Sequence, residues 1–217
     1  MLSADRVSFR YAGCDDWVLR DLTLHVAPGE VVGLSGPSGR GKTTLGRLLA
    51  GYLRPLAGQI TLDAAALPGG GFCPVQLIFQ HPELAINPRW RIARALSESG
   101  ETPATLMTSL GIESGWLTRW PHELSGGELQ RVAVARALRP QTRYLIADEM
   151  TSMLDAVTQA QIWHVILDFA RRQNVGLLVI SHEAALLDRI CDRAQCVDDL
   201  ASECGTARTC AGGRVAG

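Results

Sequence analysis

Short runs of apolar and β-branched residues open the chain, and Asp, Pro and Gly separate them. The runs DRVSFRY, VLRDLTLHV and GEVVGLSG predict three strands. From Gly41 the spacing becomes helical, because Leu45, Leu48 and Leu49 fall on one side and Gly51 supplies a C-terminal stop. We therefore expect a β-rich start that meets a helix at a glycine-rich boundary.

Helical and strand patterns alternate over the rest of the chain. GQITLDAAAL and PVQLIFQ predict two further strands, and an interrupted helical pattern then predicts a helical subdomain over about 82–130. Next come a helix over 126–139, the strand RYLIA, a helix over 156–172, the strand VGLLVIS and a helix over 183–190. This alternation predicts an α/β fold with a parallel sheet flanked by helices. Residues from about 198 to 217 are small and polar, which is typical of a disordered tail.

Composition places the chain among soluble globular proteins. Its 217 residues fit one domain, with 47% hydrophobic residues, 20% charged residues and a formal net charge of -1. This charge gives no support for a nucleic-acid partner. No apolar run reaches the roughly 18 residues that cross a bilayer, and the N-terminus lacks the apolar segment of a secretory signal. We expect a cytosolic protein that reaches a membrane only through another subunit.

Six cysteines are scattered along the chain without CxxC spacing. They are Cys14, Cys73, Cys191, Cys196, Cys204 and Cys210. In the expected cytosol they are free thiols. The closer spacing of the last four leaves a metal site as an alternative, although the paired short spacings of zinc sites are missing.

The segment GPSGRGKTT contains the pattern GxxxxGKT between a predicted strand and a predicted helix, which is the context that a phosphate-binding loop requires. Glycines allow backbone N–H groups to approach phosphate oxygens, and the helix N-terminus adds a favourable dipole. Lys42 is expected to neutralise β- and γ-phosphate charge, and the Thr43 hydroxyl to ligate Mg²⁺. The alternative is a glycine-rich turn that only caps a helix. The predicted ATP contacts here are Gly36, Pro37, Ser38, Gly39, Arg40, Gly41, Lys42, Thr43 and Thr44.

The segment RYLIADE brings Asp148 and Glu149 to the carboxyl end of a predicted central strand, where α/β proteins place ligands. Because side chains alternate along a strand, the two carboxylates point in different directions. Asp148 is predicted to bind Mg²⁺, and Glu149 to act as the general base on a water that faces the γ-phosphate. The alternative is a solvated acidic strand end.

Three more candidate residues stand at strand ends. His182 follows VGLLVIS and would bond the γ-phosphate and orient the attacking water. The alternative has Ser181 as the cap of the next helix and His182 as a first-turn histidine without chemistry. Gln80 ends QLIFQ, and its amide would contact the metal or water. Tyr11 either packs against the core or stacks its ring on adenine.

Two adjacent glycines stand at the start of the helix in PHELSGGELQRVAVARAL. Ser125 and Glu128 form the pattern S-x-x-E, so a well-capped helix start is one interpretation. Gly126 and Gly127 would each cost up to about 1 kcal/mol relative to alanine inside a helix. Capping does not account for them, whereas bare backbone that approaches a ligand does.

Together these motifs resemble the nucleotide-binding subunit of ATP-binding cassette (ABC) transporters, over nearly the whole chain to residue 198. The phosphate loop is similar to the Walker A motif, LSGGE to the family signature, YLIADE to the Walker B strand, and SMLD, which ends at Asp155, to the D-loop. Gln80, His182 and Tyr11 match the Q-loop, the H-loop and the aromatic residue that stacks on adenine.

The resemblance implies a P-loop NTPase core, an N-terminal antiparallel β subdomain and an inserted helical signature subdomain, all in one ATPase domain over residues 1–217. It also implies an Mg²⁺-dependent ATP hydrolase. The implied catalytic residues are Glu149, His182 and Lys42, and the implied metal-binding residues are Thr43, Gln80 and Asp148.

Subunits of this family work as head-to-tail pairs that drive transmembrane permease subunits. The resemblance therefore implies a second ATPase subunit, identical or different, whose ATP would face Ser125, Gly126, Gly127 and Glu128. It places the chain at the cytoplasmic face of the inner membrane, with an extracytoplasmic substrate-binding protein as an indirect partner. FQHPELAINPR and the signature segment are most similar to importers of peptides, nickel or metal-chelating opines.

The chain departs from the family pattern at several positions. Met150 and Met153 stand where proline and alanine are usual, which leaves the D-loop geometry open. Glu128 replaces the commoner glutamine. After Cys191 the usual strand-and-glycine ending is compressed, and the C-terminal extension of peptide-type importers is missing, so regulation through it is not expected.

Two other classes of protein share the nucleotide motifs. A cytosolic ABC protein without a transporter usually joins two cassettes or inserts coiled coils, and this chain shows one cassette and no sustained heptads. An ATP-binding regulator without hydrolysis is the second alternative. The presence of both Glu149 and His182 argues against this alternative, because the loss of either residue would be the simplest way to abolish hydrolysis.

Overall fold

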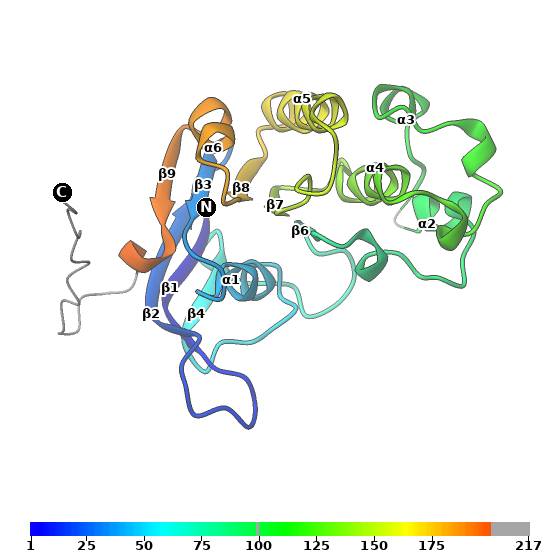
Figure 1. Ribbon diagram of the computed structural model, residues 1–217. Helices are drawn as coiled ribbons and strands as arrows, with labels where there is room; N and C mark the ends of the chain where they lie inside the picture. Colours follow the sequence, from blue (N-terminus) through cyan, green and yellow to red (C-terminus); the bar gives the residue numbers. More distant parts are fainter. Residues whose placement is uncertain (99, 201–217) are drawn as a thin grey trace, which may run out of the picture.

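The structure is a computed structural model, and it describes residues 1–98 and 100–200. Two sheets and a set of helices make up this part of the chain (Figure 1). The antiparallel sheet has the strand order β2-β1-β4-β5, and the parallel sheet has the order β6-β7-β8-β3-β9. The predicted α/β fold, with an antiparallel sheet at the N-terminus and a parallel sheet flanked by helices, is confirmed.

The elements follow one another in the predicted alternation. The strands are β1 (Leu2–Phe9), β2 (Leu19–Val26), β3 (Val31–Ser35), β4 (Ala57–Leu62), β5 (Ala65–Ala66), β6 (Val75–Ile78), β7 (Tyr144–Asp148), β8 (Gly176–Ile180) and β9 (Arg193–Cys196). The α-helices are α1 (Lys42–Leu49), α2 (Ile92–Ser97), α3 (Ala104–Ser109), α4 (Gly126–Ala137), α5 (Ala156–Gln173) and α6 (Ala184–Ile190). The 3₁₀ turns are η1 (Pro82–Leu84), η2 (Ser114–Trp116), η3 (Pro121–Glu123) and η4 (Val197–Leu200).

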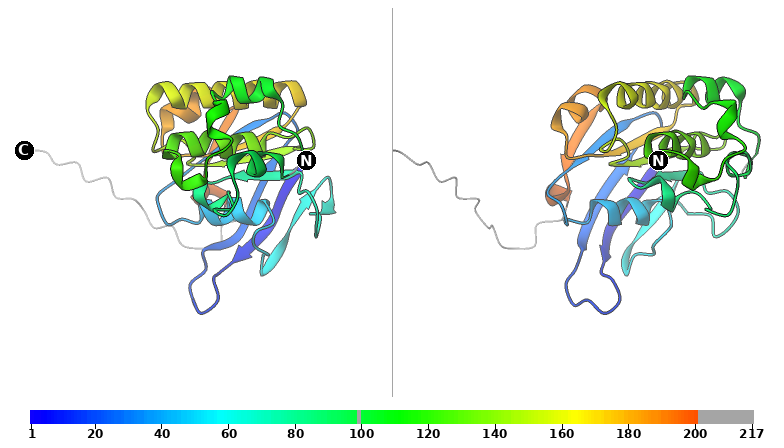
Figure 2. Two further views of the ribbon diagram at one scale, coloured as in Figure 1. Left: turned by 90° about the vertical axis from the view of Figure 1, so that its right-hand side faces the viewer. Right: turned by 45° about the vertical axis from the view of Figure 1, so that its right-hand side comes forward.

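Successive residues of the central strand β7 point into two different apolar layers. Tyr144 and Ile146 pack in the layer that contains α1 and the antiparallel sheet, and Leu145 and Ala147 pack in the layer that contains α4 and α5. Figure 2 shows these two groups of elements on opposite sides of the parallel strands. Since both faces of β7 and β8 are covered, their sequences are continuous apolar runs. The carboxyl end of β7 is therefore buried as well.

The C-terminal region differs from the prediction. Strand β9 pairs with β3 from Val32↔Arg193 to Ser35↔Cys196, where no strand was predicted, because its polar alternation is that of a sheet edge. The disordered tail predicted from about residue 198 is wrong for residues 198–200, which belong to η4. Buried Val197 anchors this turn against the phosphate loop. Residues 201–217 of the predicted tail lie outside the described part.

Two strand boundaries also shift. The first strand covers Leu2–Phe9 instead of the run DRVSFRY, so Tyr11 follows it in a loop. The run GQITLDAAAL is divided into β4 and β5, because Asp63 and Ala64 adopt left-handed backbone angles with φ of 50° and 63°. A tight turn therefore replaces the continuous strand that the composition predicts.

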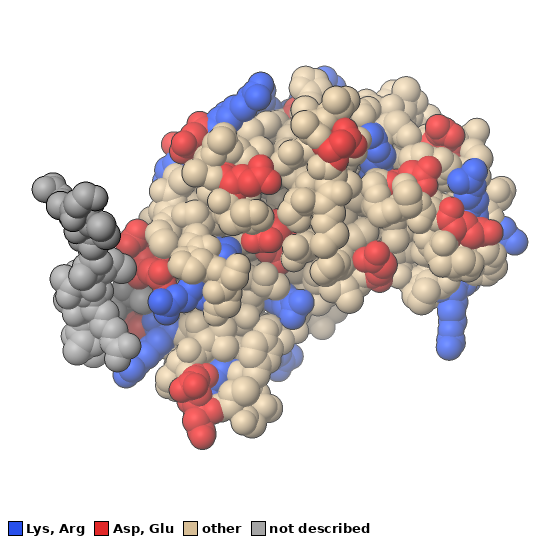
Figure 3. All heavy atoms as spheres, in the orientation of Figure 1, with Lys and Arg blue, Asp and Glu red and all other residues tan. Residues whose placement is uncertain are grey.

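The surface shows no concentration of one charge on the face in Figure 3, where acidic and basic side chains are interspersed. No helix within residues 1–98 and 100–200 is long and apolar enough to cross a membrane.

The cysteines of the described part are free, as predicted, and differ in exposure. Cys14 is exposed, whereas burial raises the pKa of Cys191 to about 11. Cys204 and Cys210 lie outside the described residues, so the clustered metal site suggested for the last four cysteines remains a hypothesis. No group of three potential ligands for a metal ion occurs among the residues that are described.

This difference predicts selective alkylation. Near pH 8, only about one Cys191 thiol in a thousand would be ionised, so iodoacetamide should modify Cys191 at least about tenfold more slowly than Cys14. Peptide mapping by mass spectrometry measures both rates in one sample. In urea the difference should disappear, and equal rates in the native protein would contradict the buried position of Cys191.

Candidate functional site

The phosphate loop joins β3 to α1 at one end of the parallel sheet. Gly41 has a φ of 83°, and a Cβ there would lie 2.7 Å from the Leu19 side chain, so only glycine fits. No side chain caps α1, which leaves its first N–H groups available to a ligand. The buried Lys42 ammonium donates hydrogen bonds to the carbonyl oxygens of Gly36 at 2.7 Å and Pro37 at 3.0 Å. The loop thus folds around its own lysine.

A pocket of about 360 Å³ opens beside this loop. It is lined by Tyr11, Val18, Ser38, Gly39, Gly41, Lys42, Thr43, Thr44, Gln80 and Glu149. Tyr11 is 39% exposed, packs edge-on against Phe9, and its hydroxyl lies 3.1 Å from the Thr44 hydroxyl. Val18 was not predicted to line this pocket, because an apolar residue before a strand carries no chemical signal. Gly36, Pro37 and Arg40, also predicted to contact ATP, do not line the pocket, and Arg40 pairs with Asp198 at 3.6 Å.

Asp148 ends β7 below this pocket and is only 3% exposed. Its Oδ1 has no hydrogen-bond partner within the described part of the chain. Burial raises the pKa of Asp148, and a hydrogen bond with Thr43 partly opposes this effect. A buried carboxylate oxygen without a partner, next to a hydroxyl, is the donor set of a hard cation such as Mg²⁺. Asp148 and Thr43, two of the three residues predicted to bind the metal, therefore fit this ion.

Glu149 has other partners than Asp148, but it lies beyond the last residue of β7, so strand alternation does not set its direction. Its Oε1 lies 3.4 Å from Nδ1 of His182, and its Oε2 accepts a 3.5 Å hydrogen bond from Nε2 of Gln80. Glu149 has a φ of 45°, an uncommon backbone angle that functional residues often adopt. The fold thus brings together three residues that lie 33 to 102 positions apart: Gln80, Glu149 and His182.

The helix after His182 begins later than predicted. The alternative in which Ser181 caps this helix does not hold, because α6 begins at Ala184 with Glu183 as its N-cap residue. The Ser181 hydroxyl instead accepts a hydrogen bond from the Glu183 N–H at 3.1 Å. His182 therefore precedes the helix, and its side chain is 60% exposed beside Glu149, which lines the pocket.

The turn after Glu149 is held from α5. The Thr151 hydroxyl accepts hydrogen bonds from Nε2 of Gln159 at 3.1 Å and from Nε1 of Trp163 at 3.2 Å. The Ser152 hydroxyl donates to the Glu149 carbonyl oxygen at 2.9 Å, and Met150 is buried in the core. A turn of defined geometry therefore forms here without the proline that is usual in the family.

These bonds predict a stability effect. Thr151→Val keeps the side-chain shape but leaves the buried Trp163 N–H without its partner, and should lower the free energy of unfolding by about 1–3 kcal/mol. Urea titration measures the change. The exposed neighbour provides the control, since Ser152→Ala should cost less than about 1 kcal/mol. Equal losses for the two variants would contradict the role of the Thr151 hydroxyl.

The signature segment, residues 124–128, starts α4 with the predicted capping box. The Ser125 hydroxyl accepts a hydrogen bond from the Glu128 N–H at 3.3 Å, and the Glu128 carboxylate accepts one from the Ser125 N–H at 2.7 Å. A Cβ on Gly126 would meet nothing within 4 Å, and one on Gly127 would only touch Leu154 at 3.4 Å. Packing within this chain therefore does not require either glycine.

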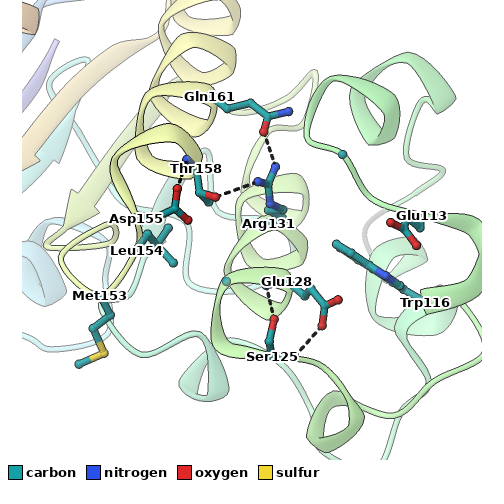
Figure 4. A pocket seen from close by; sticks show the side chains of 12 residues that line it. Glu113, Trp116, Ser125, Glu128, Arg131, Met153, Leu154, Asp155, Thr158 and Gln161 are labelled. Atoms are coloured by element: carbon teal, nitrogen blue, oxygen red, sulfur yellow. Dashed lines mark hydrogen bonds between the residues drawn. The ribbon is translucent and has the colours of Figure 1, made fainter.

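A second pocket, of about 510 Å³, opens at this segment (Figure 4). It is lined by Gly111, Glu113, Trp116, Ser125, Gly127, Glu128, Arg131, Met153, Leu154, Asp155, Thr158 and Gln161. Asp155 caps α5, because its carboxylate accepts hydrogen bonds from the N–H groups of Val157 and Thr158, and these bonds lower its pKa. Among the described residues, none lines both pockets. The chain carries two separate partial sites.

Comparison with known proteins assigns this arrangement to a family. The profile described as "ABC transporter" matches residues 19–152. The chain belongs to the ABC transporter family. A peptide import ATP-binding protein of Brucella ovis is 34% identical over 195 residues, which cover 81% of this chain and 62% of that protein. This ABC chain therefore spans less than two thirds of that relative.

Another relative and two solved structures support the assignment. The nickel import system ATP-binding protein NikE of Staphylococcus aureus is 34% identical, over 94% of this chain and 91% of that protein. A dimeric bacterial ABC transporter cassette has a TM-score of 0.76 at 22% identity, over 90% of this chain and 94% of that one. A post-hydrolysis dimer bound to ADP and Pi has a TM-score of 0.75 at 21% identity and the same coverage. The structures establish the ABC cassette fold.

Proposed function

We propose that this chain is the ATP-hydrolysing subunit of an ABC transporter that imports a peptide, nickel or a metal chelate. The observation that carries the proposal is the pocket that the Lys42 loop, Gln80 and Glu149 line together. Asp148 is hydrogen-bonded to Thr43 of this loop, and His182 lies 3.4 Å from Glu149. The names of the relatives, which are importers of peptides and of nickel, support the direction and the class of cargo.

In this proposal the phosphate loop binds the nucleotide. Lys42 exchanges its two carbonyl partners for β- and γ-phosphate oxygens, and the uncapped N–H groups of α1 donate to the phosphates. Tyr11 leaves the Thr44 hydroxyl and stacks on adenine. Thr43, Gln80 and Asp148 bind Mg²⁺, which supplies positive charge to the phosphate oxygens when it is bound.

Glu149 then serves as the general base. Its carboxylate is half-buried and directed by Gln80 on one oxygen and by His182 on the other, so it accepts a proton from water in a restricted orientation. His182 is exposed enough to contact a γ-phosphate while its Nδ1 faces Glu149. Gln80, Glu149 and His182 are thus the chain's own contribution to orienting the attacking water.

The second pocket supplies the other half of a shared site. Ser125, Gly126, Gly127 and Glu128 offer a helix N-terminus without lysine or metal ligand, suited to a γ-phosphate bound by the phosphate loop of a second ATPase subunit. Packing within the chain leaves room for a methyl group at both glycines, so it does not explain their presence. Close approach of a ligand to their bare backbone does explain it. Permease subunits would then bring the pair to the cytoplasmic face of the membrane, with a substrate-binding protein as an indirect partner.

Hydrolysis by the purified chain tests the proposal. If two chains share each site, the specific activity should rise with protein concentration, because association forms the active unit. A dimer with a micromolar dissociation constant dissociates over about a hundredfold dilution. A specific activity that stays constant over that range would contradict a dimeric active unit. Co-purification with the permease subunits tests the transport part separately.

Ser125→Arg tests the shared site directly. The larger, charged side chain would fill the space offered to the second nucleotide, so hydrolysis and ATP-driven dimerisation should fall at least about tenfold. Binding of ADP to the chain's own phosphate loop should not change, because the two pockets share no lining residue among those described. Ser97→Arg, on the exposed end of α2, is the control. Unchanged dimerisation of the Ser125 variant would contradict the shared site.

A further inference from the structure

The side chain of Arg131 connects three helices beneath the second pocket. Its Nη1 donates hydrogen bonds to the Leu110 carbonyl oxygen at 2.6 Å and to Oε1 of Gln161 at 2.9 Å. Its Nη2 donates to the Thr158 hydroxyl at 3.3 Å. Figure 4 shows the guanidinium of Arg131 between α4, which carries it, and the Thr158 and Gln161 side chains of α5. One side chain thus ties α4 to α5 and to the end of α3.

All three acceptors of Arg131 are neutral, and no ion pair of this residue occurs within residues 1–98 and 100–200. A planar guanidinium places its donors in a fixed fork, so its hydrogen bonds define direction as well as distance. Arg131 therefore contributes geometry to this junction more than charge. A flexible ammonium would not reach the same three acceptors in one conformation.

The bridge meets α5 next to the D-loop, residues 152–155. Thr158 donates its backbone N–H to the Asp155 carboxylate at 3.0 Å and offers its hydroxyl to Arg131. The D-loop and the signature segment also lie close to each other, since a Cβ built on Gly127 would come within 3.4 Å of the Leu154 side chain. The Arg131 bridge therefore lies where the two segments are neighbours.

The end of α3 is fastened to the same bridge. Nε2 of Gln161 donates to the Ser109 carbonyl oxygen at 3.2 Å, while Arg131 holds the next carbonyl, that of Leu110. Gly111 adopts a φ of 66°, and a Cβ there would approach Nη1 of Arg131 to 3.2 Å. The turn after α3 thus leaves room for the guanidinium.

We infer that Arg131 is a positioning residue that locks the signature segment and the D-loop into one preformed surface for the second ATPase subunit. This inference rests on the proposed function. Ser125 and Asp155 begin two different helices, and both line the pocket offered to the second subunit. A surface that is already ordered loses less conformational entropy on association, so the bridge strengthens dimerisation by holding Ser125 and Asp155 in place.

Dimerisation of the full chain tests the role of Arg131. In a Glu149→Gln background with ATP and Mg²⁺, the protein concentration for half-dimerisation should rise about tenfold with Arg131→Met. With Arg131→Lys, which keeps the charge but loses the planar fork of donors, this concentration should rise by a smaller factor. The Lys variant also provides the test if the Met variant does not fold. The affinity for mant-ADP, which reports the chain's own phosphate loop, should change less than about twofold in both variants.

Arg136→Met is the matched control on the same helix. Arg136 donates to the carbonyl oxygens of Ala85 and Ala95 and pairs with Glu98. Within residues 1–98 and 100–200, its side chain makes no hydrogen bond or ion pair with α5 or the D-loop. For the Arg136 variant, the protein concentration for half-dimerisation should stay within about twofold of the background. This should hold even if its unfolding midpoint falls as far as that of the Arg131 variant.

Three outcomes separate the alternatives. Dimerisation of Arg131→Met at the background concentration would overturn the inference, and so would an equal loss with Arg136→Met, since general weakening of the helical region would then explain it. If the Glu149→Gln background itself does not dimerise with ATP, the shared site of the proposed function fails instead.

Discussion

Replacement of Glu149 by glutamine should lower steady-state ATP turnover by about 100-fold or more and leave ATP binding intact. Glutamine retains the shape of the side chain and one acceptor oxygen for the Gln80 amide, but it cannot accept a proton from water. Removal of the negative charge also reduces repulsion toward the γ-phosphate, so ATP should hold the variant as a dimer. Phosphate release and size-exclusion chromatography measure the two effects.

A matched change nearby separates base catalysis from electrostatics. Glu183→Gln removes the same charge from an exposed residue next to His182 and should alter turnover less than about threefold. Turnover of the Glu149 variant at the wild-type rate would remove Glu149 from the role of general base. An equal loss in both variants would assign the effect to the local field.

Replacement of Lys42 by alanine should weaken ATP binding by about tenfold or more, because charge-assisted hydrogen bonds to phosphate are lost. The ammonium already lies inside the loop, 2.7 Å and 3.0 Å from two carbonyl oxygens, so binding requires only local exchange of partners. Titration with mant-ATP measures the affinity. Arg54→Ala, which changes an exposed residue beyond the end of α1, is the control and should bind as the wild type does.

Lys42 also permits a test without mutation, since it is the only lysine in the chain. An amine-directed acylating reagent can modify only Lys42 and the N-terminal amine, and ATP should protect Lys42 alone. Mass spectrometry of the two peptides gives both rates in one experiment. Equal modification of Lys42 with and without ATP would exclude it from the nucleotide site.

The sequence predicts best the features that neighbouring residues define. The phosphate loop, the acidic end of β7 and the capping box of Ser125 and Glu128 each depend on a few consecutive positions, so residue type and spacing suffice. Long-range packing explains the features that the sequence did not predict. Strand β9 has a polar alternation and exists because β3 offers an edge, and Val197 is buried only because it meets the phosphate loop.

Residue types alone determined that this protein has a phosphate-binding loop, two strand-end acids, and a glycine-rich helix start that its own stability does not favour. Only the tertiary structure decided that Gln80 and His182 meet Glu149, and that Arg131 joins α4 to α5. The physical reason is that these interactions join side chains 27 to 69 positions apart in the chain. Residues so far apart share no local spacing, so no pattern in the sequence marks the pair until the chain has folded.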